Sequence, residues 1–310
     1  MLDTLTFLFV KYLSNHGKSY ETVEEWNTRL EHFIASHNFI EEQNASGSLY
    51  TSGHNQFSDW SQDEYESMLG LKEWMRADHS LMEPFTGVAN SASLDWRDVD
   101  GVVTPVKDQG QCGSCWAFSA TEAMESAYVI AGNSQVIMSP QEIVDCAKGL
   151  FSSHGCNGGW YYYAWDWLSS HKSMTEADYP YTSGTTGQET SCAYDSAVGV
   201  TNVASYVQVA QDTDSIKAGI EYGPSSVAVA AGNNVFRYYT SGIVTESDGC
   251  PTSVDHAIVA VGFGYEGDQG YYIVRNSWNT TWGDQGYIKL GMASGKGVCG
   301  INQDVYYPII

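Results

Sequence analysis

The chain has 310 residues, which is enough for one large domain or two smaller ones with an apolar core. Hydrophobic residues make up 43% and charged residues 16%, a composition typical of globular rather than disordered proteins. The formal net charge is −23, and both residues 1–90 (14 acidic, 5 basic) and residues 91–310 (23 acidic, 9 basic) are acidic. Such a surface argues against binding to nucleic acid or anionic membranes. It indicates either solubility alone or adaptation to an acidic compartment.

Apolar segments are short throughout the chain. No run approaches the ~18 residues of a membrane-spanning helix. The longest apolar stretch near the start, Phe7 to Val10, follows Asp3 and is too short for the core of a signal peptide. If the protein is secreted, we expect its signal peptide to be absent from this chain.

The cysteine count indicates disulfides. Seven cysteines, an odd number, predict three disulfides and one free thiol, but spacing alone leaves the free cysteine and 15 pairings of the others open. Cys112 and Cys115 form the only CxxC, with no second pair at zinc spacing. We therefore expect no metal and no cofactor.

Residues 1–90 are predicted to form a mostly helical N-terminal unit. Apolar residues recur at helical spacing, and one short run is strand-like. The predicted helices are 6–15, 24–44 and 63–69, and the strand-like run is 49–57. Residues 77–93 lose this periodicity and contain Pro84 and Gly87, which predicts a linker and a domain boundary between 88 and 93.

Residues 91–310 are predicted to be helical first and β-rich later. The predicted helices are 114–130, 139–144 and 160–168, and the predicted strands are 227–230, 257–262, 271–274 and 287–290. This order predicts an α+β fold with a helical and a β-rich subdomain. A functional site is expected in the cleft between them.

Cys115 lies in the first turn of the helix predicted at 114–130. Unsatisfied N–H groups and the helix dipole at that position favour an anion, so a thiolate nucleophile is expected there. The alternative is that Cys115 is half of a disulfide.

His256 and Asn276 are predicted to meet on a β-hairpin. If the turn is centred near Glu266, position 256 lies opposite position 276, and an amide oxygen can orient the imidazole. Trp278 would shield the pair from water. A histidine satisfied within the core is the simpler alternative.

Three motifs together resemble the papain and cathepsin L family of cysteine proteases. They are QGQCGSCWAFS at 109–119, Asp255-His256-Ala257 and Asn276-Ser277-Trp278. The resemblance implies a two-subdomain papain-like fold with a helical left half, a β-barrel-like right half and a helical propeptide domain. It implies that Cys115 is the nucleophile, that His256 is its ion-pair partner and that Asn276 orients His256. Gln109 and the backbone N–H of Cys115 would form the oxyanion hole.

The resemblance also implies the disulfides and the substrate cleft. The implied pairs are Cys112–Cys156, Cys146–Cys192 and Cys250–Cys299, which would require an oxidising environment. Gly158 and Gly159 would pair with the substrate backbone. The remaining substrate-binding residues implied are Trp160, Ala228, Val254, Asp255, Trp278 and Asp304.

Asp304 is the unusual member of that set. By resemblance it forms the floor of the second subsite, the pocket for the residue two before the cut bond, where many relatives have a small or apolar residue. We expect Asp304 to pair with arginine while Ala228, Val254 and Trp160 accept apolar side chains. The alternative is that Asp304 faces solvent and that leucine or phenylalanine is preferred.

The N-terminal unit resembles the inhibitory propeptide of the same family. The residues on its two motifs are Glu25, Arg29, Phe33, Ile40 and Asn44, followed by Gly53, Asn55, Phe57 and Asp59. Ser36 replaces the usual asparagine, a change expected to matter little. This propeptide is typical of the cathepsin L branch. No His-rich insertion resembling an occluding loop lies between Gly159 and Cys192, which favours an endopeptidase.

The chain is therefore expected to be a latent cysteine endopeptidase with an inhibitory propeptide at 1–90 and a peptidase domain at 91–310. The expected partners are protein and peptide substrates and its own propeptide, and we expect a monomer. We expect a lysosomal or other acidic vesicular location, or secretion. Two N-glycosylation sequons begin at Asn44 and Asn279.

Three other functions stay open. A catalytically silent papain-like binding protein would fail to react with a thiol-directed probe. A redox module would form a reversible Cys112–Cys115 bridge. Another Cys–His chemistry, such as amide transfer, is disfavoured because the propeptide and cleft motifs occur together.

Overall fold

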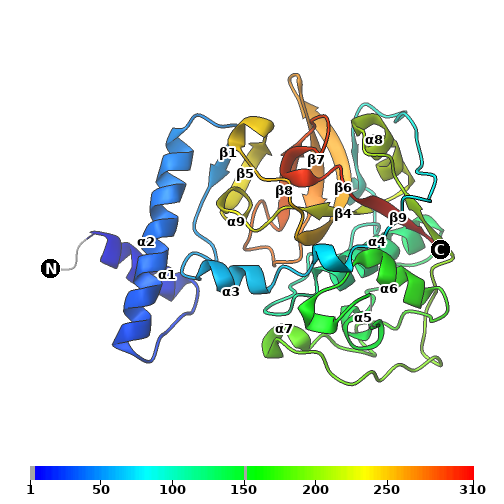
Figure 1. The fold of residues 1–310 in the computed structure, drawn as a ribbon, viewed down its shortest axis with the longest axis horizontal. Helices are drawn as coiled ribbons and strands as arrows, with labels where there is room; N and C mark the ends of the chain where they lie inside the picture. The colour runs from blue at the N-terminus through cyan, green and yellow to red at the C-terminus, as the bar shows by residue number, and fades with distance from the viewer. Residues whose placement is uncertain (1–3, 150–151) are drawn as a thin grey trace.

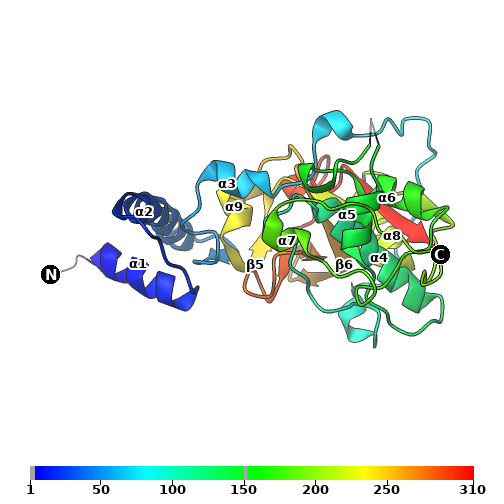
Figure 2. The same ribbon diagram turned by 90° about the horizontal axis from the view of Figure 1, so that it is seen from below.

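The computed structural model describes residues 4–149 and 152–310. Two helices that cross each other, α1 (Thr4–Asn15) and α2 (Val23–Ala45), stand apart at one end of the molecule (Figures 1 and 2). The Thr22 side chain caps α2 by accepting the N–H of Glu25. Phe33 packs between α1 and α2 and is buried together with Phe9 and Tyr12.

The rest of the N-terminal unit leads from these helices to the main body. Strand β1 (Tyr50–Ser52) pairs antiparallel with β5 (Tyr239–Val244) and so extends the sheet of the main body. Helix α3 (Gln62–Ser67) begins with a capping box between Ser61 and Glu64. A 3-10 turn, η1 (Glu73–Met75), follows on the segment that crosses between the strands and the helices of the main body (Figure 1).

The helical subdomain surrounds one long buried helix. Its elements are η2 (Trp96–Asp98), α4 (Cys115–Ile130), α5 (Pro140–Cys146), η3 (Gly155–Asn157), α6 (Tyr161–Leu168) and α7 (Ser183–Thr186). The first twelve residues of α4 are buried because the helix is covered by α5 and α6 on one side and by the sheet on the other. The start of α4 is therefore fixed firmly beside the sheet.

The second subdomain is a sheet that packs against α4. Its strands are β2 (Leu94–Asp95), β3 (Ser205–Gln208), β4 (Ser225–Val229), β5, β6 (His256–Glu266), β7 (Gln269–Arg275), β8 (Tyr287–Gly291) and β9 (Val305–Ile309). The order is β1-β5-β8-β7-β6-β4-β9-β3, with β2 also paired to β6. The shorter helical elements of this part are α8 (Thr213–Tyr222), α9 (Asn234–Arg237), η4 (Glu246–Asp248) and η5 (Val298–Gly300).

The predicted helices and strands are present with ends shifted by a few residues, and several elements were not anticipated. Helix α8 is the longest of these. Its sequence does carry a helix signal that was overlooked, because Asp212 caps the helix and Ile216 and Ile220 face the core. Strands β3, β5 and β9 were also missed. None of the helices within the described ranges is long and apolar enough to cross a membrane.

Candidate active site

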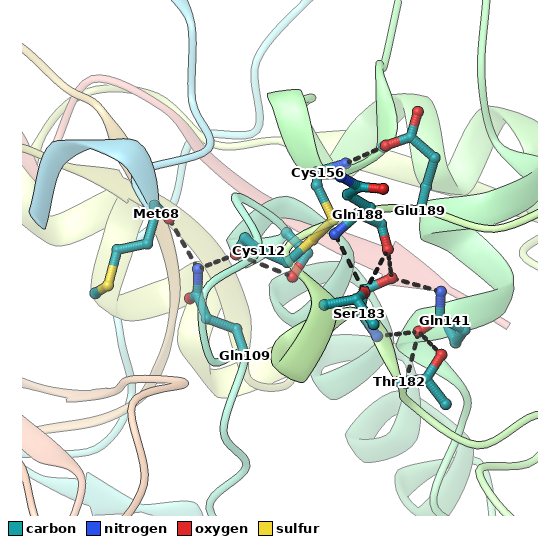
Figure 3. Close-up of a disulfide and its surroundings, with 12 residues drawn as sticks. Met68, Gln109, Cys112, Gln141, Cys156, Thr182, Ser183, Gln188 and Glu189 are labelled. Carbon is teal, nitrogen blue, oxygen red and sulfur yellow. Dashed lines mark hydrogen bonds between the residues drawn. A yellow bond between two sulfur atoms is a disulfide. The ribbon is translucent and has the colours of Figure 1, made fainter. Parts of the chain in front are cut away.

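Cys115 is the first residue of α4 and is completely buried. It is the free cysteine of the described ranges. Its neighbour in the CxxC, Cys112, is bonded to Cys156 instead, which ties the loop before α4 to the segment at 155–159 (Figure 3). The other disulfides join Cys146 to Cys192 and Cys250 to Cys299. These pairs are the ones that the resemblance implies, and they leave no Cys112–Cys115 bridge for a redox module.

His256 and Asn276 meet at the ends of β6 and β7. The Nε2 atom of His256 lies 2.8 Å from Oδ1 of Asn276, and both residues are buried. Trp278 stacks on the imidazole with ring centroids 4.5 Å apart and is itself buried, so it shields the pair from water as expected.

The predicted hairpin register is wrong by two residues. The turn is at Gly267 and Asp268, because Glu266 pairs with Gln269, and a bulge follows between Ala260 and Gly262. Val259 pairs with Arg275, so the same register places position 256 across from position 278 rather than 276. Asn276 therefore reaches the imidazole diagonally, and Trp278 takes the opposing place.

Gln109 directs its amide nitrogen toward the cleft. Its Oε1 accepts hydrogen bonds from Ser277 Oγ at 2.8 Å and from the Trp278 indole at 3.2 Å, which fixes the orientation of the amide. Its Nε2 donates to the carbonyl oxygens of Cys112 and Met68, each at 2.9 Å (Figure 3). The Met68 carbonyl of the N-terminal unit thus accepts a hydrogen bond from Gln109 Nε2, the group expected to donate to the oxyanion.

The N-terminal unit also covers the thiol itself. A β-carbon built on Gly70 would lie 3.0 Å from Sγ of Cys115, so the backbone at Gly70 passes directly over the sulfur. The Gly70 carbonyl accepts the N–H of Gly159 at 3.0 Å, and the Leu71 N–H donates to the carbonyl of Asp255 at 3.0 Å. The cleft backbone therefore holds residues 68–84, which we call the inhibitory segment, through hydrogen bonds at Gly70 and Leu71.

Gly158 is part of this close approach. A β-carbon at Gly158 would lie 2.3 Å from the carbonyl oxygen of Gly70, and its φ of +115° favours glycine. The carboxylate of Asp255, in contrast, accepts the N–H groups of Ala231 and Gly232. Within the described ranges, Asp255 therefore binds the inhibitory segment through its backbone carbonyl, which accepts the N–H of Leu71.

Burial keeps the two reactive groups neutral in this latent form. Burial raises the pKa of the Cys115 thiol to about 11, and the backbone N–H groups of Ala257 and Gly70 oppose this only in part. Burial also lowers the pKa of His256 to about 4, against the effect of the Asn276 hydrogen bond. The helix N-terminus, expected to favour a thiolate, is outweighed here by desolvation. An ion pair requires the covering segment to leave.

Asp304 lies in a pocket that the N-terminal unit fills with Arg76. The Arg76 Nη2 atom lies 2.5 Å from Oδ2 of Asp304, and the guanidinium lies 5.7 Å from the centre of the Trp160 ring. Ala228 and Val254 belong to the same buried cluster as Trp160, together with Leu71 and Met75 of the N-terminal unit. With Arg76 in place, Asp304 is only 4% exposed.

The remaining contacts of the N-terminal unit centre on two motif residues. Asp59 is buried and bonded to Lys18, Tyr12 and Tyr20, which joins α1 to the loop before α3. Asn55 donates to the carbonyl of Arg237 at 2.7 Å. The propeptide motif thus both closes its own fold and contacts the main body.

Ser36 has a larger role than expected. Its hydroxyl donates to the Ser58 carbonyl at 2.7 Å and lies 2.6 Å from the hydroxyl of Tyr238 in the main body. The serine that replaces the usual asparagine therefore lies at the contact between helix α2 and the main body.

The structure thus brings together Gln109, Cys115, His256, Asn276 and Trp278 at one end of the cleft and Trp160, Ala228, Val254 and Asp304 along it. Sequence reasoning missed the residues that fill this cleft, namely Met68, Gly70, Leu71, Lys72 and Arg76. One signal was available: Lys72 and Arg76 are the only lysine or arginine in residues 60–90, opposite an acidic subsite. In the described ranges no cluster of His, Cys, Asp and Glu could hold a metal ion.

Comparison with known proteins agrees with the cysteine protease class that the sequence motifs predict. The model of the papain family of cysteine proteases matches residues 90–309, and that of the cathepsin propeptide inhibitor domain matches residues 9–65. A buried cysteine at a helix start, a His–Asn pair and a covering N-terminal segment define the proenzyme of a cysteine protease. The chain belongs to the papain family.

Individual relatives span nearly the whole chain. Thiol protease aleurain of Arabidopsis thaliana is 37% identical over 97% of this chain and 84% of its own length. Digestive cysteine proteinase 1 of Homarus americanus is 36% identical over 97% and 94%. The solved structure of digestive procathepsin L 3 of Tenebrio molitor superposes with a TM-score of 0.87, at 30% identity and full coverage of both chains.

Proposed function

We propose that the processed chain is a cysteine endopeptidase in which Cys115, His256, Asn276 and Gln109 perform catalysis. The observation that carries the proposal is the His256–Asn276 hydrogen bond at the same cleft as a free cysteine on a helix start. In the active form the proton of Cys115 resides on His256. The thiolate attacks the substrate carbonyl carbon, and the resulting oxyanion accepts hydrogen bonds from Gln109 Nε2 and the Cys115 N–H.

The remaining steps return the site to its starting state. Protonated His256 gives its proton to the leaving amine as the carbon–nitrogen bond breaks, which leaves a thioester on Cys115. Water then attacks the thioester while His256 takes one of its protons. The tetrahedral species collapses to release the carboxylic acid and the Cys115 thiolate. Asn276 holds the imidazole in the orientation that both steps require.

The N-terminal unit acts as the inhibitor of this reaction. Residues 1–90 place Gly70 over the thiol and Met68 at Gln109, so no substrate carbonyl can enter. We propose cleavage in the exposed linker between residues 88 and 93, close to Val88, which is 74% exposed. Acid release in a lysosome, another acidic vesicle or an extracellular fluid fits the disulfide content.

The endopeptidase assignment and the cathepsin L branch are supported by the segment between Gly159 and Cys192. In the structure this segment forms α6, a loop and α7, and its one histidine, His171, stacks on Trp167. The endopeptidase assignment is tested by comparing the hydrolysis of internally quenched peptides with that of substrates that have a free amino terminus next to the cut bond. Cleavage within the longer peptides supports an endopeptidase, whereas cleavage confined to the terminal residue contradicts it.

The second subsite is proposed to accept both apolar side chains and arginine. Arg76 shows that a guanidinium fits between Asp304 and Trp160, while the neighbouring walls at Ala228 and Val254 are apolar. Protein and peptide substrates with arginine or leucine at this position are therefore expected.

A thiol-reactive peptide probe tests the catalytic assignment against a silent binding protein. After acid processing, the probe should label Cys115 and abolish hydrolysis in the same proportion. An alkylated Cys115 with undiminished hydrolysis would contradict the assignment, and so would a processed protein that neither reacts nor hydrolyses peptides.

A further inference from the structure

Three tyrosines from separate elements form an aromatic face beside the Asp304 pocket. Tyr162 comes from α6, Tyr206 from β3 and Tyr306 from β9. The Tyr306 ring centroid lies 5.7 Å from that of Tyr162 and 6.2 Å from that of Tyr206. Tyr306 follows Asp304 by two residues on extended chain, so both side chains point to the same side. We call Tyr162, Tyr206 and Tyr306 the tyrosine site.

The propeptide covers the tyrosine site with His79. The Nδ1 atom of His79 lies 2.8 Å from the hydroxyl of Tyr306. Its ring centroid is 4.6 Å from Tyr162, 5.5 Å from Tyr306 and 6.2 Å from Tyr206. His79 follows Arg76 by three residues, so an imidazole and a guanidinium of the inhibitory segment occupy adjoining sites. Burial lowers the pKa of the His79 imidazole, and Asp166 opposes this shift.

The chemistry of the tyrosine site suits a cation. The Tyr206 hydroxyl donates to the carboxylate of Asp166 at 3.1 Å, so a negative charge lies at one edge, and Asp304 lies at the other. Phenol rings attract cations over their faces, and two carboxylates add to that attraction. A groove of about 370 Å³ lies between residues 76–84 of the propeptide and a surface that includes Gln303, Asp304 and Tyr306, so this surface becomes accessible when the propeptide leaves.

We propose that in the processed enzyme the tyrosine site binds a second basic side chain of the substrate, beyond the Asp304 pocket as seen from Cys115. The proposal rests on the proposed peptidase function. The inhibitory segment runs from Cys115 at Gly70 to Asp304 at Arg76 and then to His79, so the tyrosine site continues the path that the segment follows along the cleft. Protein substrates with two basic residues near each other are the class that such a two-part site selects.

The test uses enzyme activated from the full chain and internally quenched peptides with arginine two residues before the cut bond. Lysine is placed in turn at each of the four preceding positions, with alanine as the reference. At one or two of these positions, lysine should raise kcat/KM by about 5–10-fold, mainly through a lower KM. Asp166→Asn and Tyr206→Leu should each remove most of this gain. Glu246→Gln is the matched control, because it removes one exposed charge next to β5, far along the sheet from β9.

The outcomes separate this inference from the proposed function. If the parent peptide is cleaved but lysine gives no gain at any position, or the gain survives both variants, the tyrosine site does not bind substrate. Synthetic peptides covering residues 68–82 with His79→Lys or His79→Ala give a second measurement. If the enzyme variants change only the inhibition by these peptides and not the gain from lysine in substrates, the tyrosine site anchors the propeptide alone and the proposal is wrong. If no peptide is cleaved at all, the proposed function fails, and the inference fails with it.

Discussion

Gly70 and Gly113 approach so closely that a β-carbon at Gly70 would lie 2.1 Å from the carbonyl oxygen of Gly113. The inhibitory segment can pass over the thiol only because Gly70 has no side chain there. Gly70→Ala should therefore weaken docking of the segment by ~1–3 kcal/mol, the typical cost of forcing an extra carbon into a packed contact.

This weakening should appear as faster self-processing and as partial activity of the uncut chain at neutral pH. The measurement is hydrolysis of a fluorogenic peptide together with chain length over time. Glu83→Ala is the matched control, because it changes an exposed residue of the same segment. Unchanged latency of Gly70→Ala would show that the segment is not held at this contact.

Replacing the proposed nucleophile should separate folding from chemistry. Cys115→Ala should fold with all three disulfides and persist as the full-length chain in acid, because no thiolate remains to cut it. Mass spectrometry of the chain after incubation near pH 4.5 checks this in the absence of other proteases. Normal self-processing of the variant would show that Cys115 is not the nucleophile.

The oxyanion donor can be tested by itself. Gln109→Ala should lower kcat by ~10²–10³-fold with little change in KM, because the lost hydrogen bond forms fully only in the transition state. Gln111→Ala, an exposed neighbour, is the control. A change confined to KM would mean that Gln109 binds the ground state rather than the oxyanion.

A histidine stack predicts how acid loosens the propeptide. His54 stacks on Phe33 with centroids 4.3 Å apart, and its Nε2 lies 3.1 Å from Nδ1 of His37. Burial lowers the pKa of His54 to about 4, assisted by the nearby His37 and His16. Because the folded pKa is below the ordinary value of 6.5, the neutral ring stabilises the fold fully above pH 6.5. That stability is lost as pH falls toward 4.

The full shift corresponds to about 3 kcal/mol, and partial exposure of the ring reduces this to roughly 1–2 kcal/mol. His54→Phe should therefore lower the pH midpoint of self-processing and raise the thermal stability of the Cys115→Ala chain at pH 4.5 but not at pH 7.5. His171→Phe, which changes a stacked histidine in the peptidase domain, is the control. An unchanged midpoint for His54→Phe would place the acid response elsewhere in the propeptide.

The comparison of sequence and structure shows which features local patterns could predict. Helix α4 and its reactive terminus followed from the spacing of apolar residues, because helices are set by residues close in the chain. The register of β6 and β7 failed because the turn at Gly267 and the bulge near Val261 depend on backbone conformations that alternation does not encode.

Local sequence patterns also could not predict the protonation state of the thiol or the residue that fills the acidic subsite. A helix-terminal cysteine predicts a thiolate, yet burial under Gly70 keeps the thiol protonated. The Arg76–Asp304 pair joins residues 228 positions apart, so only the folded cleft shows that the propeptide places arginine in the acidic subsite. The resemblance to a family supplied the roles of Cys115 and His256, but not this occupant.

The Arg76–Asp304 pair leads to a prediction about specificity. Burial raises the pKa of Asp304 to about 7, with the Arg76 guanidinium opposing the shift. A substrate arginine that takes the place of Arg76 should be favoured while Asp304 is ionised, so the preference should decline as pH falls and Asp304 becomes protonated. Leucine at the same position makes no charged contact, and its kcat/KM should not follow that titration. A charge-assisted bond in such a pocket contributes roughly 1.5–3 kcal/mol, on the order of tenfold to a hundredfold in selectivity.

The measurement is kcat/KM for Arg-Arg and Leu-Arg fluorogenic dipeptides between pH 4.5 and 7.5, in the wild type, Asp304→Ala and Asp304→Asn. Both variants should lose the arginine preference and its pH dependence while they retain hydrolysis of Leu-Arg. Asp304→Asn separates charge from shape, because it preserves the size of the pocket floor. Glu246→Gln is the matched control, since it removes an exposed acid next to β5, far along the sheet from the Asp304 pocket, and should leave the ratio for dipeptides unchanged. If Arg-Arg is not cleaved by the wild type, or if the ratio is the same in Asp304→Ala, then Asp304 does not select the substrate and its contact with Arg76 acts only to hold the propeptide.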